Sequence, residues 1–280
     1  MSLKSFKTPL RYPGGKSRAC KKMEPFFPDL RDYDVYYEPF LGGGSVALHI
    51  TKKYPKLKIV VNDLYEPLYN FWLQLQVNGD YVHTELQQLK SRFPDRGSAR
   101  GLFEDAKEKL YDLEISDKDR AVCFYIINKC SFSGLTESSS FSEQASDANF
   151  SMRGIDKLPV YSKLIKDWYI TNVDYCHLLG DKEKTFVYLD PPYDIKDNLY
   201  GKKGSIHKKF DHDDFAKNCE IYNSEMLISY NSDQLVKDRF KDWNCAEFDL
   251  TYTMRSVGEY MRNQKIRKEL LLFNYNTGVF

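Results

Sequence analysis

Paired cysteines of the Cys-x-x-Cys kind are missing from this sequence. Its six cysteines, at positions 20, 123, 130, 176, 219 and 245, stand apart, which excludes a zinc ribbon and a dithiol redox site. The five histidines have no metal-ligand spacing, and we expect no metal. Isolated cysteines in a chain of 280 residues are typical of reduced, buried thiols in a cytosolic compartment.

Long apolar runs and an excess of one charge are also missing. The first residues, Met1–Lys7, contain no apolar segment like that of a secretory signal, and no run approaches membrane-spanning length. Lys and Arg number 41 against 40 Asp and Glu, a net charge of +1, so any polyanion would have to bind local basic clusters. We expect a soluble protein of the cytoplasm with no membrane partner.

Short β-strand patterns alternate with helical ones over much of the chain. Helices are predicted after Gly44, from Pro67, and over 213–223 and 232–242. The predicted strands are 35–37, 58–63, 168–171, 185–189, 226–230, 246–250 and 269–274. This alternation is typical of an α/β protein with a mainly parallel, doubly wound, Rossmann-like sheet.

Residues 76–160 differ from the rest of the chain. Leu86, Leu89 and Phe93 have helical spacing, and Ala121–Cys130 is strongly apolar. Residues 131–151 are polar and serine-rich, and we expect them to form a long loop. We therefore predict one domain built from 1–75 and 161–280, interrupted by a mostly helical lobe at 76–160.

A glycine-rich turn follows the first predicted strand, in the sequence Glu38-Pro39-Phe40-Leu41-Gly42-Gly43-Gly44. Glycines there let a ligand approach the backbone at the N-terminus of the next helix. Asp63 comes 19 residues after Gly44, at the end of the second strand. At that spacing an acid binds the ribose hydroxyls of a nucleotide-like ligand. A tight turn beside a solvated Asp63 is the alternative interpretation.

Near the N-terminus, Tyr12-Pro13-Gly14-Gly15-Lys16-Ser17 ends like a phosphate-binding P-loop. Leu10 stands where a P-loop has its first glycine, Pro13 stiffens the turn, and no apolar strand precedes it. These departures favour a basic N-terminal turn, with an NTP-binding protein as the alternative.

A rigid acidic motif, Asp190-Pro191-Pro192-Tyr193, follows the apolar strand 185–189. Open α/β sheets bind their ligands at the carboxyl ends of strands. The two prolines fix the backbone, so that the Asp190 carboxylate and a proline carbonyl can point the same way. Two acceptors beside an aromatic ring suit a flat substrate that carries an amino group. The alternative is a rigid turn that only ends the strand.

Together, Tyr12–Lys16, Glu38–Gly44, Asn62-Asp63 and Asp190–Tyr193 resemble the Dam-like, D12 class of DNA adenine-N6 methyltransferases, in the motif order of the α group. Residues 227–231 and 269–275 resemble later strands of that family. The resemblance implies S-adenosylmethionine as the methyl donor, without a metal. It implies catalysis by Asp190, Pro191, Pro192 and Tyr193. It implies cofactor binding by Tyr12, Gly14, Lys16, Glu38, Phe40, Gly42, Gly44, Asp63 and Asp190.

The DNA-recognition motif departs from the family pattern. Family members that read GATC usually carry Phe-Asn-Gly-Leu-Tyr-Arg, where this chain has Phe132-Ser133-Gly134-Leu135-Thr136-Glu137. We therefore expect a short palindrome other than GATC, with CATG as one candidate. In the lobe, the residues expected to contact DNA are Lys129, Ser133, Thr136, Glu137 and Gln144. Outside it, phosphate contacts are expected from Lys202, Lys203, Lys208 and Arg255.

The partner that this resemblance implies is double-stranded DNA. A cognate restriction endonuclease is expected as a functional partner without physical association, and the enzyme as a monomer or weak dimer. Three alternatives stay open: methylation of RNA or of a protein glutamine, NTP binding at Gly15-Lys16-Ser17, and a catalytically silent DNA-binding module. A cytosine-C5 enzyme is disfavoured, because none of the 11 prolines precedes a cysteine.

Overall fold

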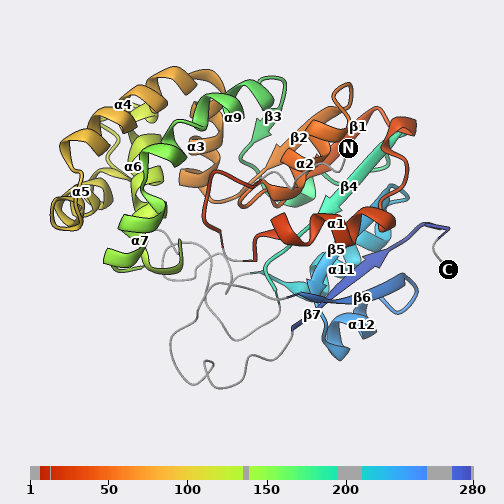
Figure 1. Ribbon diagram of the computed structural model, residues 1–280. Coiled ribbons are helices and arrows are strands. Elements are labelled where there is room, and N and C mark those ends of the chain that lie inside the picture. The colour runs from red at the N-terminus through yellow and green to blue at the C-terminus, as the bar shows by residue number, and fades with distance from the viewer. Residues whose placement is uncertain (1–6, 13, 135–138, 194–209, 251–266, 279–280) are drawn as a thin grey trace.

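Seven strands form a single sheet in the computed structural model, which describes residues 7–12, 14–134, 139–193, 210–250 and 267–278. The spatial order of the strands is β3-β2-β1-β4-β5-β7-β6. Figure 1 shows the sheet beside the group of helices α4, α5, α6 and α7. The strands are β1 (Val35–Glu38), β2 (Lys58–Asn62), β3 (Tyr169–Thr171), β4 (Thr185–Leu189), β5 (Glu225–Asn231), β6 (Asn244–Leu250) and β7 (Arg267–Phe273).

The first five strands are parallel, and β7 runs antiparallel between β5 and β6. Along β4, Phe186 and Tyr188 belong to one buried cluster, whereas Val187 and Leu189 belong to another. Because successive side chains of a strand point to opposite faces, both faces of the sheet are covered. The predicted Rossmann-like, doubly wound sheet is therefore confirmed.

Helices cover these faces and form a separate group beside them. The α-helices are α1 (Cys20–Met23), α2 (Ser45–Lys53), α3 (Glu66–Val77), α4 (Gly79–Arg92), α5 (Arg96–Lys109), α6 (Asp117–Cys130), α7 (Glu143–Asn149), α8 (Met152–Ile155), α9 (Leu158–Leu164), α11 (His212–Ile221) and α12 (Gln234–Arg239). The 3₁₀ turns are η1 (Lys16–Arg18), η2 (Glu24–Phe26), η3 (Leu30–Asp32), η4 (Phe132–Gly134) and η6 (Tyr175–His177). Among the described residues, no helix has the length and apolar character needed to cross a membrane.

A helical lobe occupies the stretch between α3 and α9, and Figure 1 shows α4, α5, α6 and α7 gathered to one side of the sheet. The buried helix α6 packs against α3, α4, α5 and α7. The prediction of one long loop over residues 131–151 is wrong for α7. The hydroxyl of Ser142 accepts a hydrogen bond from the Ala145 amide, and Ala145 and Phe150 are buried, so a capped helix forms within the polar stretch.

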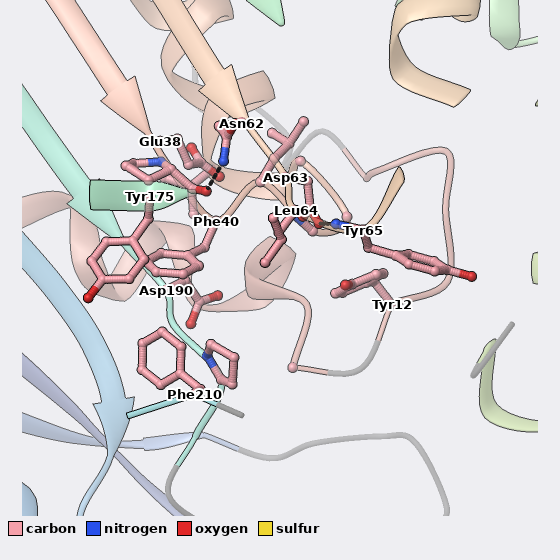
Figure 2. Close-up of a pocket in the computed structure, with 18 of the residues that line it drawn as sticks. Tyr12, Glu38, Phe40, Asn62, Asp63, Leu64, Tyr65, Tyr175, Asp190 and Phe210 are labelled. Atoms are coloured by element: carbon pink, nitrogen blue, oxygen red, sulfur yellow. Dashed lines mark hydrogen bonds between the residues drawn. The ribbon is translucent and has the colours of Figure 1, made fainter. Parts of the chain in front are cut away.

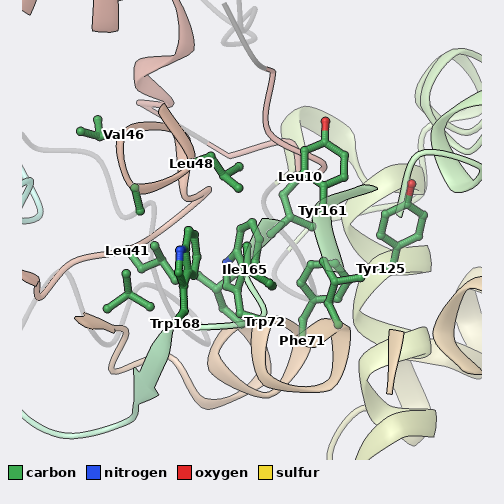
Figure 3. Close-up of a cluster of buried hydrophobic side chains, with 14 of the residues drawn as sticks. Leu10, Leu41, Val46, Leu48, Phe71, Trp72, Tyr125, Tyr161, Ile165 and Trp168 are labelled. Atoms are coloured by element: carbon green, nitrogen blue, oxygen red, sulfur yellow. The ribbon is translucent and has the colours of Figure 1, made fainter. Parts of the chain in front are cut away.

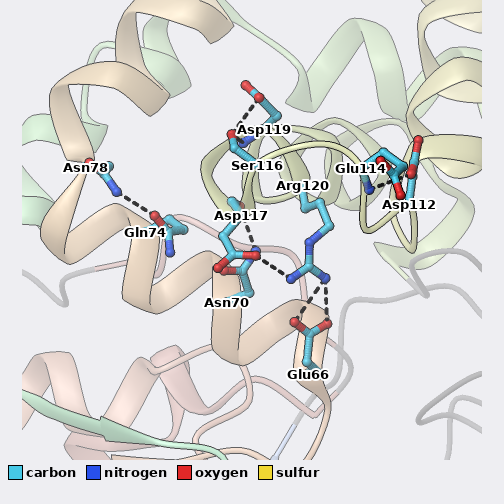
Figure 4. Close-up of polar contacts among 10 residues, drawn as sticks. All are labelled: Glu66, Asn70, Gln74, Asn78, Asp112, Glu114, Ser116, Asp117, Asp119 and Arg120. Carbon is cyan, nitrogen blue, oxygen red and sulfur yellow. Dashed lines mark hydrogen bonds and ion pairs between the residues drawn. The ribbon is translucent and has the colours of Figure 1, made fainter.

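Aromatic packing joins the lobe to the sheet domain. Phe71 of α3 stacks on Tyr125 of α6 with ring centroids 5.9 Å apart, and Figure 3 shows Phe71 and Trp72 among the other members of this core. Arg120 of α6 adds an ion pair to Glu66 of α3 at 3.1 Å and another to Asp117 at 2.7 Å (Figure 4). Because α3 begins only four residues after β2 ends, the lobe is joined to the sheet next to the carboxyl end of that strand.

The cysteines are free thiols in the structure. Cys20, Cys123, Cys130 and Cys219 are buried, as expected for reduced cysteines. Cys176 and Cys245 are exposed, and burial was the wrong prediction for these two.

Candidate active site

A cavity of about 830 Å³ opens at the carboxyl edge of the parallel strands. Its walls come from the N-terminal turn, the segments after β1, β2, β3 and β4, and the start of α11. Figure 2 shows Phe40, Tyr175 and Phe210 near the Asp190 carboxylate, with Tyr12 and Tyr65 farther along the cavity. All nine residues predicted to bind a cofactor line this cavity: Tyr12, Gly14, Lys16, Glu38, Phe40, Gly42, Gly44, Asp63 and Asp190.

The glycine turn after β1 needs glycine for two physical reasons. Gly42 and Gly44 have φ angles of +50° and +67°, which side chains disfavour. A Cβ on Gly42 would lie 2.9 Å from a ring carbon of Tyr12, and one on Gly44 would lie 2.7 Å from a ring carbon of Trp72. The Trp72 indole also donates to the Gly42 carbonyl at 3.1 Å. The turn is therefore held by two aromatic residues from other segments.

Gly44→Ala is expected to lower the free energy of unfolding by about 1–3 kcal/mol, because the new methyl group meets Trp72 in a disfavoured backbone region. Gly101→Ala in α5 is the matched control. Among the described residues, no side chain and no backbone outside its own helix lies within 4 Å of its added methyl group, and alanine in a helix is favoured by about 0.5–1 kcal/mol. Urea unfolding of both variants measures the difference, and equal effects would contradict the account of the turn.

Glu38 serves the same turn from the end of β1. Its side chain is 2% exposed, and its carboxylate accepts hydrogen bonds from the Tyr36 hydroxyl at 2.6 Å and from the Ala47 amide in the first turn of α2. Burial raises the pKa of Glu38 well above its usual range. Glu38 therefore fixes the start of α2 against β1 and supports the cavity wall from behind.

Asp63 ties the loop after β2 to the glycine turn. One carboxylate oxygen accepts from the Gly42 amide at 2.8 Å, and the other accepts from the Tyr65 amide at 3.0 Å. Burial raises the pKa of Asp63 to about 6, while these two amides oppose that rise. The carboxylate lies on the cavity wall with Leu64 and Tyr65 beside it.

Lys16 and Asp190 form a bidentate ion pair across the cavity. The Lys16 ammonium lies 2.9 Å from each Asp190 carboxylate oxygen and donates to the Gly14 carbonyl at 3.0 Å. The Lys16 side chain is 2% exposed, and that of Asp190 is 23% exposed. Lys16 begins the turn η1, and its ammonium binds a carboxylate. This arrangement disfavours the P-loop alternative, in which the lysine would face phosphates.

The Asp190 carboxylate is also held from β5. The Ser229 hydroxyl donates to one of its oxygens at 3.0 Å and is itself 2.7 Å from the Tyr188 hydroxyl. Burial raises the pKa of Asp190, Lys16 lowers it, and the negative charge of Glu269 raises it. Asp190 is thus an oriented acceptor at a strand end, where the motif predicted it.

The last residue of the motif, Tyr193, extends beyond the cavity toward β5 and β7. Its ring stacks on Tyr230 with centroids 5.7 Å apart, and the Lys16 ammonium lies 4.9 Å from its centroid. The Tyr193 hydroxyl donates to the Glu269 carboxylate. Pro191 and Pro192 between them are buried, so the motif is fixed at both ends.

Several cavity residues were missed by sequence reasoning. Leu64 follows the predicted Asp63 directly, so its position on the cavity wall could have been inferred. Tyr175 and Phe210 pack against Phe40 at centroid distances of 5.3 and 5.8 Å, tilted and edge-on respectively. Tyr175 begins the short turn η6 and Phe210 lies just before α11. Neither belongs to a local motif, and they come together only in the fold. Asp174, Asp211, Asp214 and Asn218 complete the polar rim on this side.

Among the residues predicted to contact DNA, one is buried, one is exposed, and the side chains of the others are not described by the structure. Lys129 is 9% exposed, and its ammonium donates to the Pro9 carbonyl, so we withdraw it as a DNA contact. Burial, and then the charge of Arg11, lower its pKa to about 7. Gln144 is exposed in the first turn of α7. The Ser133 side chain and the residues Thr136, Glu137, Lys202, Lys203, Lys208 and Arg255 lie outside the part that the structure describes.

Segment 7–12 connects the lobe to the glycine turn. The Asn128 side chain accepts from the Arg11 amide at 2.9 Å and donates to the Arg11 carbonyl at 2.6 Å. On the other side of this segment, the Thr8 hydroxyl donates to the Gly43 carbonyl. The end of α6 and the cavity wall are therefore held by the same short stretch of chain.

Comparisons with known sequences agree with the family resemblance of the motifs at Tyr12–Lys16, Glu38–Gly44, Asn62-Asp63 and Asp190–Tyr193. The chain matches the family model of the D12 class N6 adenine-specific DNA methyltransferases over residues 12–254. It is 26% identical to the type II methyltransferase M.MjaIII of Methanocaldococcus jannaschii, over 98% of this chain and 100% of that protein. It is 23% identical to the type II methyltransferase M1.LlaDCHI of Lactococcus lactis subsp. cremoris, over 95% and 94%. A solved structure, StiE O-MT residues 961–1257, superposes with a TM-score of 0.41 at 10% identity, over 92% of this chain and 72% of that one.

Proposed function

Because the chain belongs to the D12 class N6 adenine-specific DNA methyltransferase family, we propose that it transfers the methyl group of S-adenosylmethionine to N6 of a flipped-out adenine in duplex DNA. The observation that carries this proposal is the Asp190 carboxylate. It is fixed at a strand end by Lys16 and Ser229, and it lies on the wall of a cavity large enough for a nucleoside.

The cavity residues fit S-adenosylmethionine in their chemistry. Asp63 offers carboxylate oxygens to ribose hydroxyls, and Leu64, Phe40 and Tyr175 offer apolar and aromatic surface to a purine ring. The glycine turn before α2 lines the cavity, so its backbone is the surface that would lie beside the methionine part. When bound, S-adenosylmethionine supplies an electrophilic methyl group on a sulfonium.

The protein's part in the transfer is to prepare the adenine amine. The N6 lone pair is delocalised into the purine ring, which makes the amine a poor nucleophile. We propose that the Asp190 carboxylate and the Pro191 carbonyl each accept one N–H of the amine. These bonds favour an sp³ nitrogen whose lone pair would attack the methyl carbon, with the carbon–sulfur bond breaking and the nitrogen giving up one of its two protons. Positioning and local charge supply the catalysis.

The target base must leave the DNA helix to reach Asp190. N6 lies within a stacked base pair, so an adenine placed in this cavity has to be flipped out. We propose that the Tyr193 ring stacks on the flipped base. This ring is already held by Tyr230 and by its hydroxyl contact to Glu269, which lowers the entropy cost of presenting it.

Asp63→Ala is expected to weaken binding of S-adenosylmethionine by about 1.5–3 kcal/mol, the range of a lost charged hydrogen bond. Isothermal titration with S-adenosylmethionine measures this loss, and ATP is titrated in parallel because an NTP-binding protein is the alternative. An unchanged dissociation constant in the variant would contradict the role of Asp63. Tight ATP binding without S-adenosylmethionine binding would contradict the proposed function.

Binding of S-adenosylmethionine is expected to weaken as the pH falls below 6. The pKa of Asp63 is raised to about 6, so the carboxylate is anionic above this pH and protonated below it. At pH 5 about a tenth of the molecules keep the anion, and the dissociation constant should rise about tenfold. Asp63→Asn, which cannot titrate, should show a weaker but flatter profile. Parallel profiles for the two proteins would exclude Asp63 as the titrating group.

For the DNA partner, we propose a short palindrome other than GATC, because residues 132–137 lack the Asn and Arg that accompany GATC recognition. We propose that Gln144, Ser133, Thr136 and Glu137 read bases, and that Lys202, Lys203, Lys208 and Arg255 contact phosphates. We also propose that the enzyme is a monomer or weak dimer, and that it acts alongside a restriction endonuclease without binding it. Sedimentation with and without a DNA duplex tests the stoichiometry.

A further inference from the structure

A buried acid on the antiparallel strand β7, Glu269, contacts residues of the candidate active site. Because β7 runs against its neighbours, its first residues lie at the edge where the parallel strands end. Glu269, the third residue of β7, is opposite Asn231 at the carboxyl end of β5. Its side chain is 1% exposed. No motif predicted a role for it.

Glu269 contacts two residues of the site at once. Its carboxylate lies 3.3 Å from the Lys16 ammonium and accepts a hydrogen bond from the Tyr193 hydroxyl. Lys16 thereby lies between two carboxylates, Asp190 at 2.9 Å and Glu269 at 3.3 Å. A buried acid is costly unless it is paired, and here its partners are residues of the proposed reaction.

This arrangement bears on how Asp190 can receive a substrate. Lys16 contacts both Asp190 oxygens, and Ser229 donates to one of them. An adenine amine that binds Asp190 must therefore share or displace the Lys16 contact. The Lys16 ammonium is almost fully buried, so releasing it without another anion would leave an unpaired charge in the interior.

We propose that Glu269 is a positioning residue. When the adenine amine hydrogen-bonds to Asp190, the Lys16 ammonium moves from Asp190 to the Glu269 carboxylate and forms its ion pair there. This inference rests on the proposed function. The exchange needs only a small displacement of the ammonium, because the second carboxylate is already in contact with it. Lys16 stays paired throughout, and an oxygen of Asp190 becomes available to the amine. The contact with the Tyr193 hydroxyl keeps the Glu269 carboxylate oriented.

Glu269→Gln tests the exchange, because glutamine keeps the shape and an oxygen acceptor but loses the charge. We expect kcat for N6-adenine methylation to fall at least about tenfold, the range of one charged hydrogen bond, with KM for DNA and affinity for S-adenosylmethionine within about threefold. The acid limb of the kcat–pH profile should move to lower pH, because the Glu269 charge raises the pKa of Asp190. Thermal unfolding checks that the variant is folded.

Two further variants separate the explanations. Glu247→Gln on β6 removes an acid paired with Lys237 and Lys268 outside the cavity, and it should leave kcat and its pH profile unchanged. Tyr193→Phe keeps the ring and removes only the hydroxyl contact to Glu269. If Glu269 acts through Lys16, Tyr193→Phe should show no shift of the acid limb.

Three results would overturn the inference: wild-type kcat in Glu269→Gln, a fall in kcat without a shifted acid limb, or the same shift in Tyr193→Phe. The wild-type enzyme separates this inference from the proposed function. If wild type forms no N6-methyladenine, the proposed function fails, and this inference fails with it. If wild type does form it and Glu269→Gln behaves like wild type, only the inference about Glu269 fails.

Discussion

Asp190→Ala is expected to reduce kcat for adenine methylation by about 10²–10³-fold or more, the usual effect of removing a group that stabilises the transition state. Alanine removes the carboxylate that would accept the adenine N–H, and it releases the Lys16 ammonium from its 2.9 Å contacts. DNA affinity should change little, because most protein–DNA contacts go to phosphates. Single-turnover kinetics with saturating DNA, together with a binding titration, measure the two effects separately.

Asp190→Asn is the matched variant for this substitution. Asparagine keeps an oxygen acceptor for the amine and fills the same space, but it no longer neutralises Lys16. We expect a loss of activity smaller than in Asp190→Ala, with a lower melting temperature than wild type because the buried ammonium has then lost the charge of one of the carboxylates that contact it. Near-normal turnover in Asp190→Ala, with N6-methyladenine as the product, would remove Asp190 from the mechanism.

The second large effect is expected from exchanging residues 133–144 for the matching segment of a relative whose recognition sequence is known. The cavity lies in the sheet domain, and we propose that the lobe reads the bases. The two ends of this segment are fixed. The Phe132 amide donates to the Ser140 carbonyl at 3.0 Å, and the Ser142 amide donates to the Cys130 carbonyl at 2.9 Å. The graft should therefore keep Ser142, which also caps α7.

The expected result of this exchange is methylation at the donor's sequence, with the affinity for S-adenosylmethionine unchanged. Sequencing that detects N6-methyladenine along a plasmid gives the methylated sites directly. The control is an exchange of the exposed turn at 111–114, which lies between α5 and α6 and should leave the sites unchanged. An active 133–144 chimera that still methylates the parental sites would instead assign recognition to residues 194–212.

The sheet could be predicted because each strand has a local pattern. All seven predicted strands overlap observed ones, and the cofactor motifs line one cavity because parallel strands all end at the same edge. The antiparallel placement of β7 between β5 and β6 could not be predicted from periodicity, since direction leaves no mark on a run of apolar residues. Glu269 was missed for this reason.

Other residues depend on contacts between distant segments. Lys129 is a charged residue in the last turn of a helix, where such side chains are usually exposed. Its ammonium instead donates to the Pro9 carbonyl in the interior. Tyr175 and Phe210 reach the cavity from loops after β3 and before α11, and only the fold brings them to Phe40. Polar composition also concealed α7, whose stability comes from the Ser142 cap and the buried Ala145 and Phe150.

Asp190 is proposed to direct a methyl group from S-adenosylmethionine to N6 of adenine in DNA. The most direct measurement incubates the purified protein with unmethylated plasmid DNA and S-adenosylmethionine carrying an isotope-labelled methyl group. The DNA is then digested to nucleosides and analysed by mass spectrometry. We expect labelled N6-methyldeoxyadenosine with wild type and a loss of about 10²-fold or more of this product with Asp190→Ala. Label on cytosine, or equal labelling of adenine by both proteins, would contradict it.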